Sequence, residues 1–171
     1  MEKSMSAGNK KAFGFTLIEL LVTVAVLVVI VTLAIPNFSS LLQRNAVAVS
    51  TNALIADLSR ARNAAMTNRA KVTARLNPAA GNGWSMEVRK GENSPFAGTV
   101  LLVDDQSNTT VGVSASTIAS TPVIVSLPLD ITFNSLGWVD GAQGYSIEFS
   151  NASDSSNVCV ERSGEIHACS P

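Results

Sequence analysis

Residues 10–38 read KKAFGFTLIELLVTVAVLVVIVTLAIPNF, and this stretch decides the fold class of the chain. From Phe15 to Ile35 the only ionisable side chain is that of Glu19. At about 1.5 Å per residue, a helix of these 21 residues covers roughly 30 Å, the hydrocarbon thickness of a bilayer. The sequence therefore predicts a membrane-spanning helix that carries one acid near its start.

The acid and the flanking charges indicate a function and an orientation for this helix. A charge in hydrocarbon costs about 2.5–3.5 kcal/mol on insertion scales, so Glu19 is a functional candidate; the alternative is an acid that reaches the inner membrane surface. Residues 1–14 carry three lysines against one glutamate, which predicts a cytoplasmic N-terminus and export of everything after Pro36. A cleavable secretory signal, the competing interpretation, has a shorter apolar run of about 7–15 residues without an acid.

The helical pattern continues beyond the apolar run. Five apolar residues recur at spacings of seven, four, three and four: Val47, Leu54, Leu58, Ala61 and Ala65. These spacings place them on one face of a helix. Pro36 is predicted only to kink the helix, because a proline removes one intrahelical bond without preventing helix on either side.

Beyond Asn68 the pattern changes to alternation, and KVTARL begins a series of predicted strands. The further strands are GWSMEV, TVLLVDD, PVIVSL, DITFN, YSIEFS, NVCVER and EIHAC. Turn residues separate them, which indicates an antiparallel sheet packed on the helix, an α+β fold. Residues 104–121 are small and polar and are predicted as a long exposed loop, with a weak edge strand at Val111 to Val113.

The net charge of −1 is unevenly distributed along the chain. Residues 44–75 carry six basic side chains against one aspartate, whereas three basic side chains oppose ten acids from Leu76 onward. This distribution is not that of a chain-wide polyanion binder. The basic residues near the helix end are predicted to form a solvated face or salt bridges to acidic neighbours; weak nucleic-acid contact is the alternative, through Arg60, Arg62 and Arg69.

The two cysteines, Cys159 and Cys169, lie in the part of the chain that is predicted to be exported. A disulfide is permitted there, and free buried thiols are the alternative. Centring a hairpin turn on Gly164 places the two cysteines opposite each other. We therefore predict a bridge that fixes the register of the last hairpin.

No catalytic, cofactor or metal site is predicted. His167 is the only histidine, and no nucleophile motif surrounds it. One histidine and two closely spaced cysteines do not make a zinc site. Asp104, Asp105 and Asp140 lack the pattern of a calcium loop and are predicted as solvated loop acids. The chain is expected not to be an enzyme.

The segment KAFGFTLIELL resembles the processing site of a type IV prepilin, because Gly14, Phe15, Glu19, the apolar run and Pro36 occur together. The resemblance implies that a prepilin peptidase cuts between Gly14 and Phe15 and methylates the new amino group. It also implies that Glu19 pairs with this ammonium, in the same chain or a neighbouring one, and so sets the register of assembly. Pro36 belongs to the same assembly helix.

The head is similar to FimT/GspH-type minor pilins and pseudopilins in the segments DLSRARNAAMTNRAKVTARL, GWSMEV, ITFNSLGWV and VCVERSGEIHAC. The resemblance implies a type IV pilin-like fold and a minor pilin of a bacterial type IV pilus, which primes assembly or stands at the tip. The alternative is a GspH-type minor pseudopilin of a type II secretion system, and the second alternative is a DNA-binding competence pilin. DNA-uptake members carry Gly-Arg-x-Arg in the last hairpin, whereas here Gly164 is followed by Glu165, whose carboxylate repels phosphate.

These observations predict four parts of the chain: a cleaved leader at 1–14, a transmembrane and assembly helix at 15–36, its amphipathic continuation at 37–70 and a β-rich periplasmic head at 71–171. The precursor is expected in the bacterial inner membrane as a single-pass protein, and the mature protein in a pilus or pseudopilus. The resemblance implies as partners the major pilin, other minor pilins, the prepilin peptidase and the inner-membrane assembly platform. DNA is not an expected partner.

Overall fold

The structure is a computed structural model that describes residues 15–79, 83–91, 98–106, 111–119 and 123–169, without the side chains of residues 33–39. The chain divides into two compact units, residues 1–39 and 40–171. The described helix is α1 (Leu17–Asn68). The described strands are β1 (Val72–Pro78), β2 (Trp84–Lys90), β3 (Thr99–Gln106), β4 (Gly112–Ile118), β5 (Ile124–Val125), β6 (Leu129–Phe133), β7 (Gly144–Ser150), β8 (Ser155–Val160) and β9 (Ile166–Cys169).

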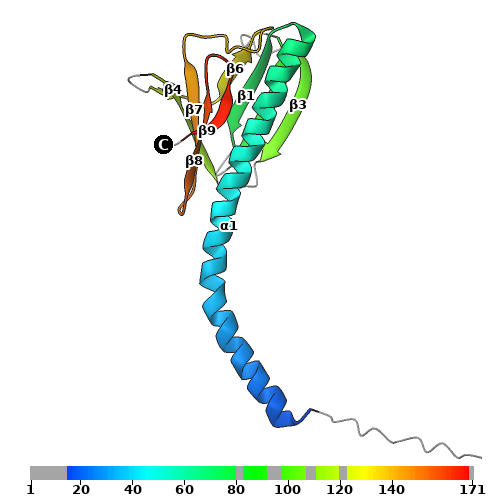
Figure 1. The fold of residues 1–171 in the computed structure, drawn as a ribbon, viewed down its shortest axis with the longest axis vertical. Coiled ribbons are helices and arrows are strands. Elements are labelled where there is room, and N and C mark those ends of the chain that lie inside the picture. Colours follow the sequence, from blue (N-terminus) through cyan, green and yellow to red (C-terminus); the bar gives the residue numbers. More distant parts are fainter. Residues whose placement is uncertain (1–14, 80–82, 92–97, 107–110, 120–122, 170–171) are drawn as a thin grey trace, which may run out of the picture. The chain divides into compact units, whose positions relative to one another are not determined.

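The strands form two antiparallel sheets, one of four strands in the order β3-β2-β1-β6 and one of five in the order β5-β4-β7-β8-β9. In Figure 1, β1 and β3 lie to the right of the head and β4, β7 and β8 to the left, with the cyan to green part of α1 alongside them. The head thus has one helix packed against two sheets.

α1 ends in a local motif that the sequence hardly signals. Arg69 has a φ of 48°, in the left-handed region, directly after the last helical residue. Its N–H donates to the Met66 carbonyl at 3.3 Å, and the Ala70 N–H donates to the Ala65 carbonyl at 3.2 Å. These two bonds define a Schellman motif, which usually places a glycine where Arg69 lies. The chain leaves the helix here and enters β1.

One hydrophobic core joins α1 to both sheets. The helix contributes the residues predicted to share one face, each at most 1% exposed: Val47, Leu54, Leu58, Ala61 and Ala65. The two sheets meet through the rings of Trp84 in β2 and Phe149 in β7, whose centroids lie 5.4 Å apart. The predicted amphipathic face is therefore confirmed, and all of its residues belong to the unit 40–171.

α1 is also attached to the turn between β7 and β8. Asn151 Nδ2 donates to the Gln43 carbonyl at 2.7 Å, and the Ser153 hydroxyl bonds to Gln43 Oε1. The turn is fixed by Asn151 Oδ1, which accepts from the Ser153 N–H at 2.9 Å and the Asp154 N–H at 3.0 Å. The helix is thereby held to the five-stranded sheet near residue 43.

The α+β fold class is confirmed, but the head differs from the prediction in two respects. Its strands form two sheets rather than one. The predicted loop at 104–121 is also wrong, because β3 continues to Gln106 and β4 lies between β5 and β7. Val111 and Ala115 are buried there. The other residues of β4 are mostly small and polar, which is why the composition resembled a loop.

The N-terminal part of α1 is the segment that was predicted to cross a membrane. Among the described residues, no helix has the length and apolarity that a crossing requires. The predicted span, 15–36, includes residues 33–36, whose side chains lie outside the described ones. The helix itself is continuous through Pro36, so this proline does not end it.

Candidate functional site in the assembly helix and the head

Glu19 lies in the first turn of α1. Its backbone N–H donates to Thr16 Oγ1 at 3.2 Å, which makes Thr16 the N-cap and Glu19 the third helical residue. These are the two positions of a capping box. A carboxylate in the first turn also lies near the positive end of the helix dipole. The T-x-x-E pattern is present in the sequence and could have predicted this second role for the acid.

The first part of α1 exposes its apolar side chains on all sides. Between Phe15 and Val31, every large apolar side chain is 45–84% exposed. The hydroxyls of Thr23 and Thr32 each donate to a carbonyl of the preceding turn at 2.8 Å, so they need no other partner. Burial of each Leu or Val contributes about 1.5–3 kcal/mol. This surface therefore needs a cover from lipid or from other chains.

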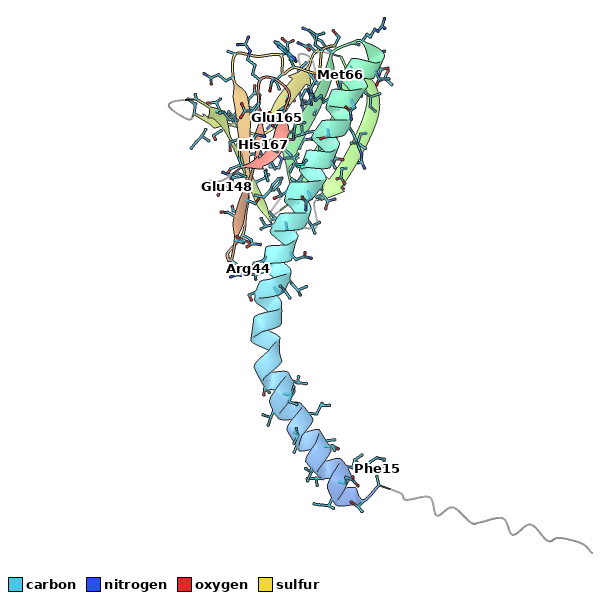
Figure 2. The ribbon with its side chains drawn as sticks, viewed as in Figure 1. Phe15, Arg44, Met66, Glu148, Glu165 and His167 are labelled. Atoms are coloured by element: carbon cyan, nitrogen blue, oxygen red, sulfur yellow. A yellow bond between two sulfur atoms is a disulfide. The ribbon has the colours of Figure 1, made fainter. Side chains whose placement is uncertain are left out.

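The predicted processing and assembly residues fall partly within the described part of the chain. Phe15 precedes α1 and is 84% exposed, and Figure 2 shows it at the start of the helix. Glu19 follows four residues later. Gly14 lies outside the described residues, and so does the side chain of Pro36.

The basic residues that were candidates for nucleic-acid contact do not form one free patch. Arg60 Nη1 lies 2.8 Å from Asp57 Oδ1, and Arg62 Nε donates to the Gly137 carbonyl at 3.1 Å. Arg69 is exposed at the end of α1. Two further basic residues form ion pairs, Lys71 with Asp140 at 2.8 Å and Arg75 with Asp130 at 2.6 Å. Salt bridges were predicted for these basic residues, and the ones described here join residues of the same chain.

Two glycines bring together the end of α1, the loop after β6 and the turn between β8 and β9. The Gly137 carbonyl accepts the hydrogen bond from Arg62 Nε, and a Cβ built on Gly164 would lie only 1.8 Å from that carbonyl oxygen. Beside them, the Val139 N–H donates to the Arg162 carbonyl at 3.0 Å and joins the two segments. The motifs ITFNSLGWV and VCVERSGEIHAC therefore form one junction.

The last hairpin carries the predicted disulfide, Cys159–Cys169, with the two Cα atoms 5.8 Å apart. Its register is not the predicted one, because Cys159 lies opposite His167 and Cys169 lies opposite Asn157. Gly164, with a φ of 78°, is the last residue of a three-residue turn rather than its centre. The bridge is thus diagonal across the hairpin.

The residues that follow this turn are those that depart from the DNA-uptake pattern. The Glu165 side chain is 73% exposed, and its Oε1 lies 4.0 Å from His167 Nδ1. Figure 2 labels both residues; Glu165 directly precedes β9 and His167 lies within it. The turn presents a carboxylate to solvent where a phosphate grip needs a cation.

A buried carboxyl group of α1 meets a half-buried carboxyl group of β3. Asp57 is 1% exposed, its Oδ1 accepts from Arg60, and its Oδ2 has no hydrogen-bond donor among the described residues. The carboxyl lies within hydrogen-bonding reach of Asp104, whose Oδ1 accepts from Gln106 Nε2 at 3.1 Å. Burial, followed by the Asp104 carboxyl, raises the pKa of Asp57 to about 6 in spite of Arg60. Below about pH 6, a proton on Asp57 therefore lets this carboxyl group donate a hydrogen bond to the Asp104 carboxylate.

The three acids considered as calcium ligands are not gathered in one loop. Asp104 and Asp105 belong to β3, so their prediction as loop acids is wrong, and Asp140 is paired with Lys71. In the part of the chain that the structure describes, no three His, Cys, Asp or Glu side chains are close enough to hold a metal ion.

The uncovered N-terminal helix, its single acid and the helix-on-sheet head define a pilin-type subunit. The chain belongs to the family described as Type II transport protein GspH, whose model matches residues 50–164. A second model, the prokaryotic N-terminal methylation motif, matches residues 9–35. The chain is thus a minor pilin or pseudopilin with a prepilin-type N-terminus, of a kind that assembles with other pilins. Such families are structural.

Solved structures show the same fold. Two crystal structures of the type IV minor pilin FimU from Pseudomonas aeruginosa match with TM-scores of 0.55 and 0.53 at 16% and 13% identity. They cover 75% and 71% of this chain and 91% of the FimU chain in each case. At these identities the likeness concerns the fold alone. No curated protein matches the chain.

Proposed function

We propose that this protein is a minor pilin of a bacterial type IV pilus, which primes assembly or stands at the pilus tip and has no enzymatic activity. The observation that carries the proposal is the uncovered apolar surface of α1 with Glu19 in its first turn. A prepilin peptidase removes residues 1–14 by cutting between Gly14 and Phe15, and methylates the new amino group. Assembly then transfers the helix from lipid to a bundle of neighbouring helices.

The chemistry at the new N-terminus explains why the acid is needed. Cleavage leaves an ammonium on Phe15, directly before the N-cap Thr16, where the positive end of the helix dipole disfavours a cation. The Glu19 carboxylate, from the same chain or a neighbour, offsets this charge. Desolvation takes back much of the gain in energy, so the main effect of the pair is to fix the register between subunits.

The four parts of the chain then take their places across the inner membrane. The leader at 1–14 is cytoplasmic, the helix at 15–36 spans the bilayer, the segment 37–70 continues it, and the head at 71–171 lies in the periplasm. The disulfide between Cys159 and Cys169 fits an oxidising compartment. The partners are the major pilin, the other minor pilins, the prepilin peptidase and the inner-membrane assembly platform.

A minor pseudopilin of a type II secretion system is the second candidate, because the matching family is described as Type II transport protein GspH. The same cleavage and the same pairing of Glu19 would serve that machine. The genes that neighbour this one would distinguish the two machines. We do not propose a DNA-binding role, since Arg60 and Arg62 are engaged within the chain and only weak contact through Arg69 would remain.

The test of this function separates the charge of Glu19 from its capping role. Glu19→Gln keeps a side chain that suits a capping box but removes the charge. Incorporation of the variant into filaments is expected to fall about tenfold, equivalent to about 1.4 kcal/mol, with normal membrane insertion. Glu19→Ala is expected to reduce incorporation into filaments by the same factor. The measurement compares the variant protein in sheared filaments with that in the membrane fraction.

Two controls make the result specific. Thr23→Ala removes a hydroxyl that is satisfied within the same helix and should assemble normally. Gly14→Val should block processing, and mass spectrometry should then find the leader still attached, whereas the Glu19 variants are cleaved. Normal incorporation of Glu19→Gln would contradict the charge-pairing proposal. If only Glu19→Ala reduced incorporation, the role of the acid would be helix capping.

A further inference from the structure

The outer face of the five-stranded sheet carries a polar row that the function described so far does not use. In the strand register, Ser114 of β4 lies opposite Glu148 of β7, which lies opposite Asn157 of β8. Ser116 and Ser146 form the next pair along on the same face. The intervening residues face the core instead: Ala115, Ile147 and Val158. Figure 2 shows Glu148 on this sheet.

These side chains line a cavity of about 270 Å³. Its wall includes the three serines, Glu148, Asn157 and, at one side, Ile124 of β5, which is 86% exposed. Pockets for whole small molecules usually measure about 300–1,000 Å³. This cavity is therefore suited to one side-chain-sized group.

The cavity offers hydrogen-bond acceptors that have no donors. Within the part of the chain that is described, the side chain of Glu148 forms no hydrogen bond or ion pair, and the buried Oδ1 of Asn157 has no partner. The serine hydroxyls can accept or donate. A carboxylate and an amide oxygen that both lack donors select a cationic group with several N–H donors.

Shape favours a guanidinium over other cations and over sugars. A guanidinium is planar, has five N–H donors and matches a carboxylate in a two-bond geometry. The aliphatic stem of an arginine side chain would pack on Ile124, as such stems do on apolar surface. Among the residues that the structure describes, the cavity has no aromatic side chain in its wall on which a sugar ring could stack.

We propose that this cavity binds the guanidinium of an arginine side chain that a protein partner presents, with Glu148 as its counter-charge. The remaining N–H groups of the guanidinium donate to the other polar side chains of the cavity, which are Ser114, Ser116, Ser146 and Asn157. The site does not depend on leader cleavage or on the pairing of Glu19, so each proposal can fail without the other.

The test uses the full chain, labelled with nitrogen-15 in detergent micelles, and N-acetyl-arginine amide as the probe. Backbone amides of β4, β7 and β8 around the cavity are expected to shift and saturate at millimolar probe. The citrulline analogue has the same shape without the charge and should bind at least tenfold more weakly. Glu148→Gln should weaken arginine binding by at least tenfold.

Glu165→Gln is the matched control, because it removes an exposed carboxylate from the turn before β9, outside the cavity, and should leave binding unchanged. As a second variant, Ser146→Lys would fill the cavity with a cation of its own and abolish binding while Glu148 is retained. The proposal is overturned if citrulline binds as well as arginine, if both glutamine variants weaken binding equally, if the shifts lie elsewhere, or if N-acetylglucosamine binds there more tightly.

Discussion

Gly164→Ala is expected to destabilise the head by about 3 kcal/mol or more. The glycine has a φ of 78°, and a Cβ at this position would lie 1.8 Å from the Gly137 carbonyl oxygen and 2.9 Å from Arg62 Nε. Backbone strain and overpacking therefore add. The obstacle is a backbone oxygen that α1 also holds through Arg62, so it cannot simply move aside.

The measurement is urea denaturation of the full chain in detergent, followed by tryptophan fluorescence, since Trp84 is fully buried. A loss of about 3 kcal/mol lowers the midpoint by roughly 1–2 M urea. Gly141→Ala is the control, because its Cβ would meet nothing closer than 4.0 Å. Gly137→Ala should lie between the two, since the Met66 side chain that it would meet can shift. Equal urea midpoints for Gly164→Ala and Gly141→Ala would contradict the claim that the close contact between Gly164 and Gly137 requires a glycine.

Asp57→Asn is expected to stabilise the protein at pH 7.5 by about 1–2 kcal/mol relative to the natural chain, and not at pH 4. The pKa of Asp57 is raised from 3.8 to about 6 in the folded state. Its protonated form therefore contributes stability that is complete below about pH 4 and is lost as the pH rises through 6, of the order of 2–3 kcal/mol. Asparagine carries no charge and can donate to Asp104. Loss of the contact with Arg60, which is 67% exposed, costs little.

The measurement is the difference in unfolding free energy between the Asp57→Asn variant and the natural chain from pH 4 to pH 8. It should rise between pH 4 and 6 and then stay level. Asp140→Asn provides the control, because that carboxylate is half-exposed and paired with Lys71 at the surface. A difference that does not change with pH would mean that Asp57 does not hold its proton against Asp104.

Local patterns in the sequence predicted much of this fold. The spacing of apolar residues predicted the buried face of α1. The alternation of apolar and polar residues, together with the turn residues between the segments, predicted most strands. Both signals work because a helix and a strand each bury one periodic face. The disulfide pairing followed from compartment and spacing, but its register did not, because Gly164 ends the turn instead of centring it.

Long-range arrangement could not be predicted in the same way. β4 is a strand because β5 and β7 pair with it, while its own small residues signal a loop. Asp57 and Asp104 meet only when α1 packs on β3, and Ser114, Glu148 and Asn157 become neighbours only through strand order. Single-sequence periodicity carries no information about which strands pair.

Besides the hydrophobic core, hydrogen bonds attach α1 to the strand connections at two described places, and this has a mechanical consequence. The turn at Asn151 binds Gln43, and the glycine junction binds Arg62, about 28 Å further along the helix. A tensile force along the axis of α1 therefore loads both sets of hydrogen bonds together in shear and does not break them one at a time. We expect the helix to separate from the strands in one abrupt step under such a force.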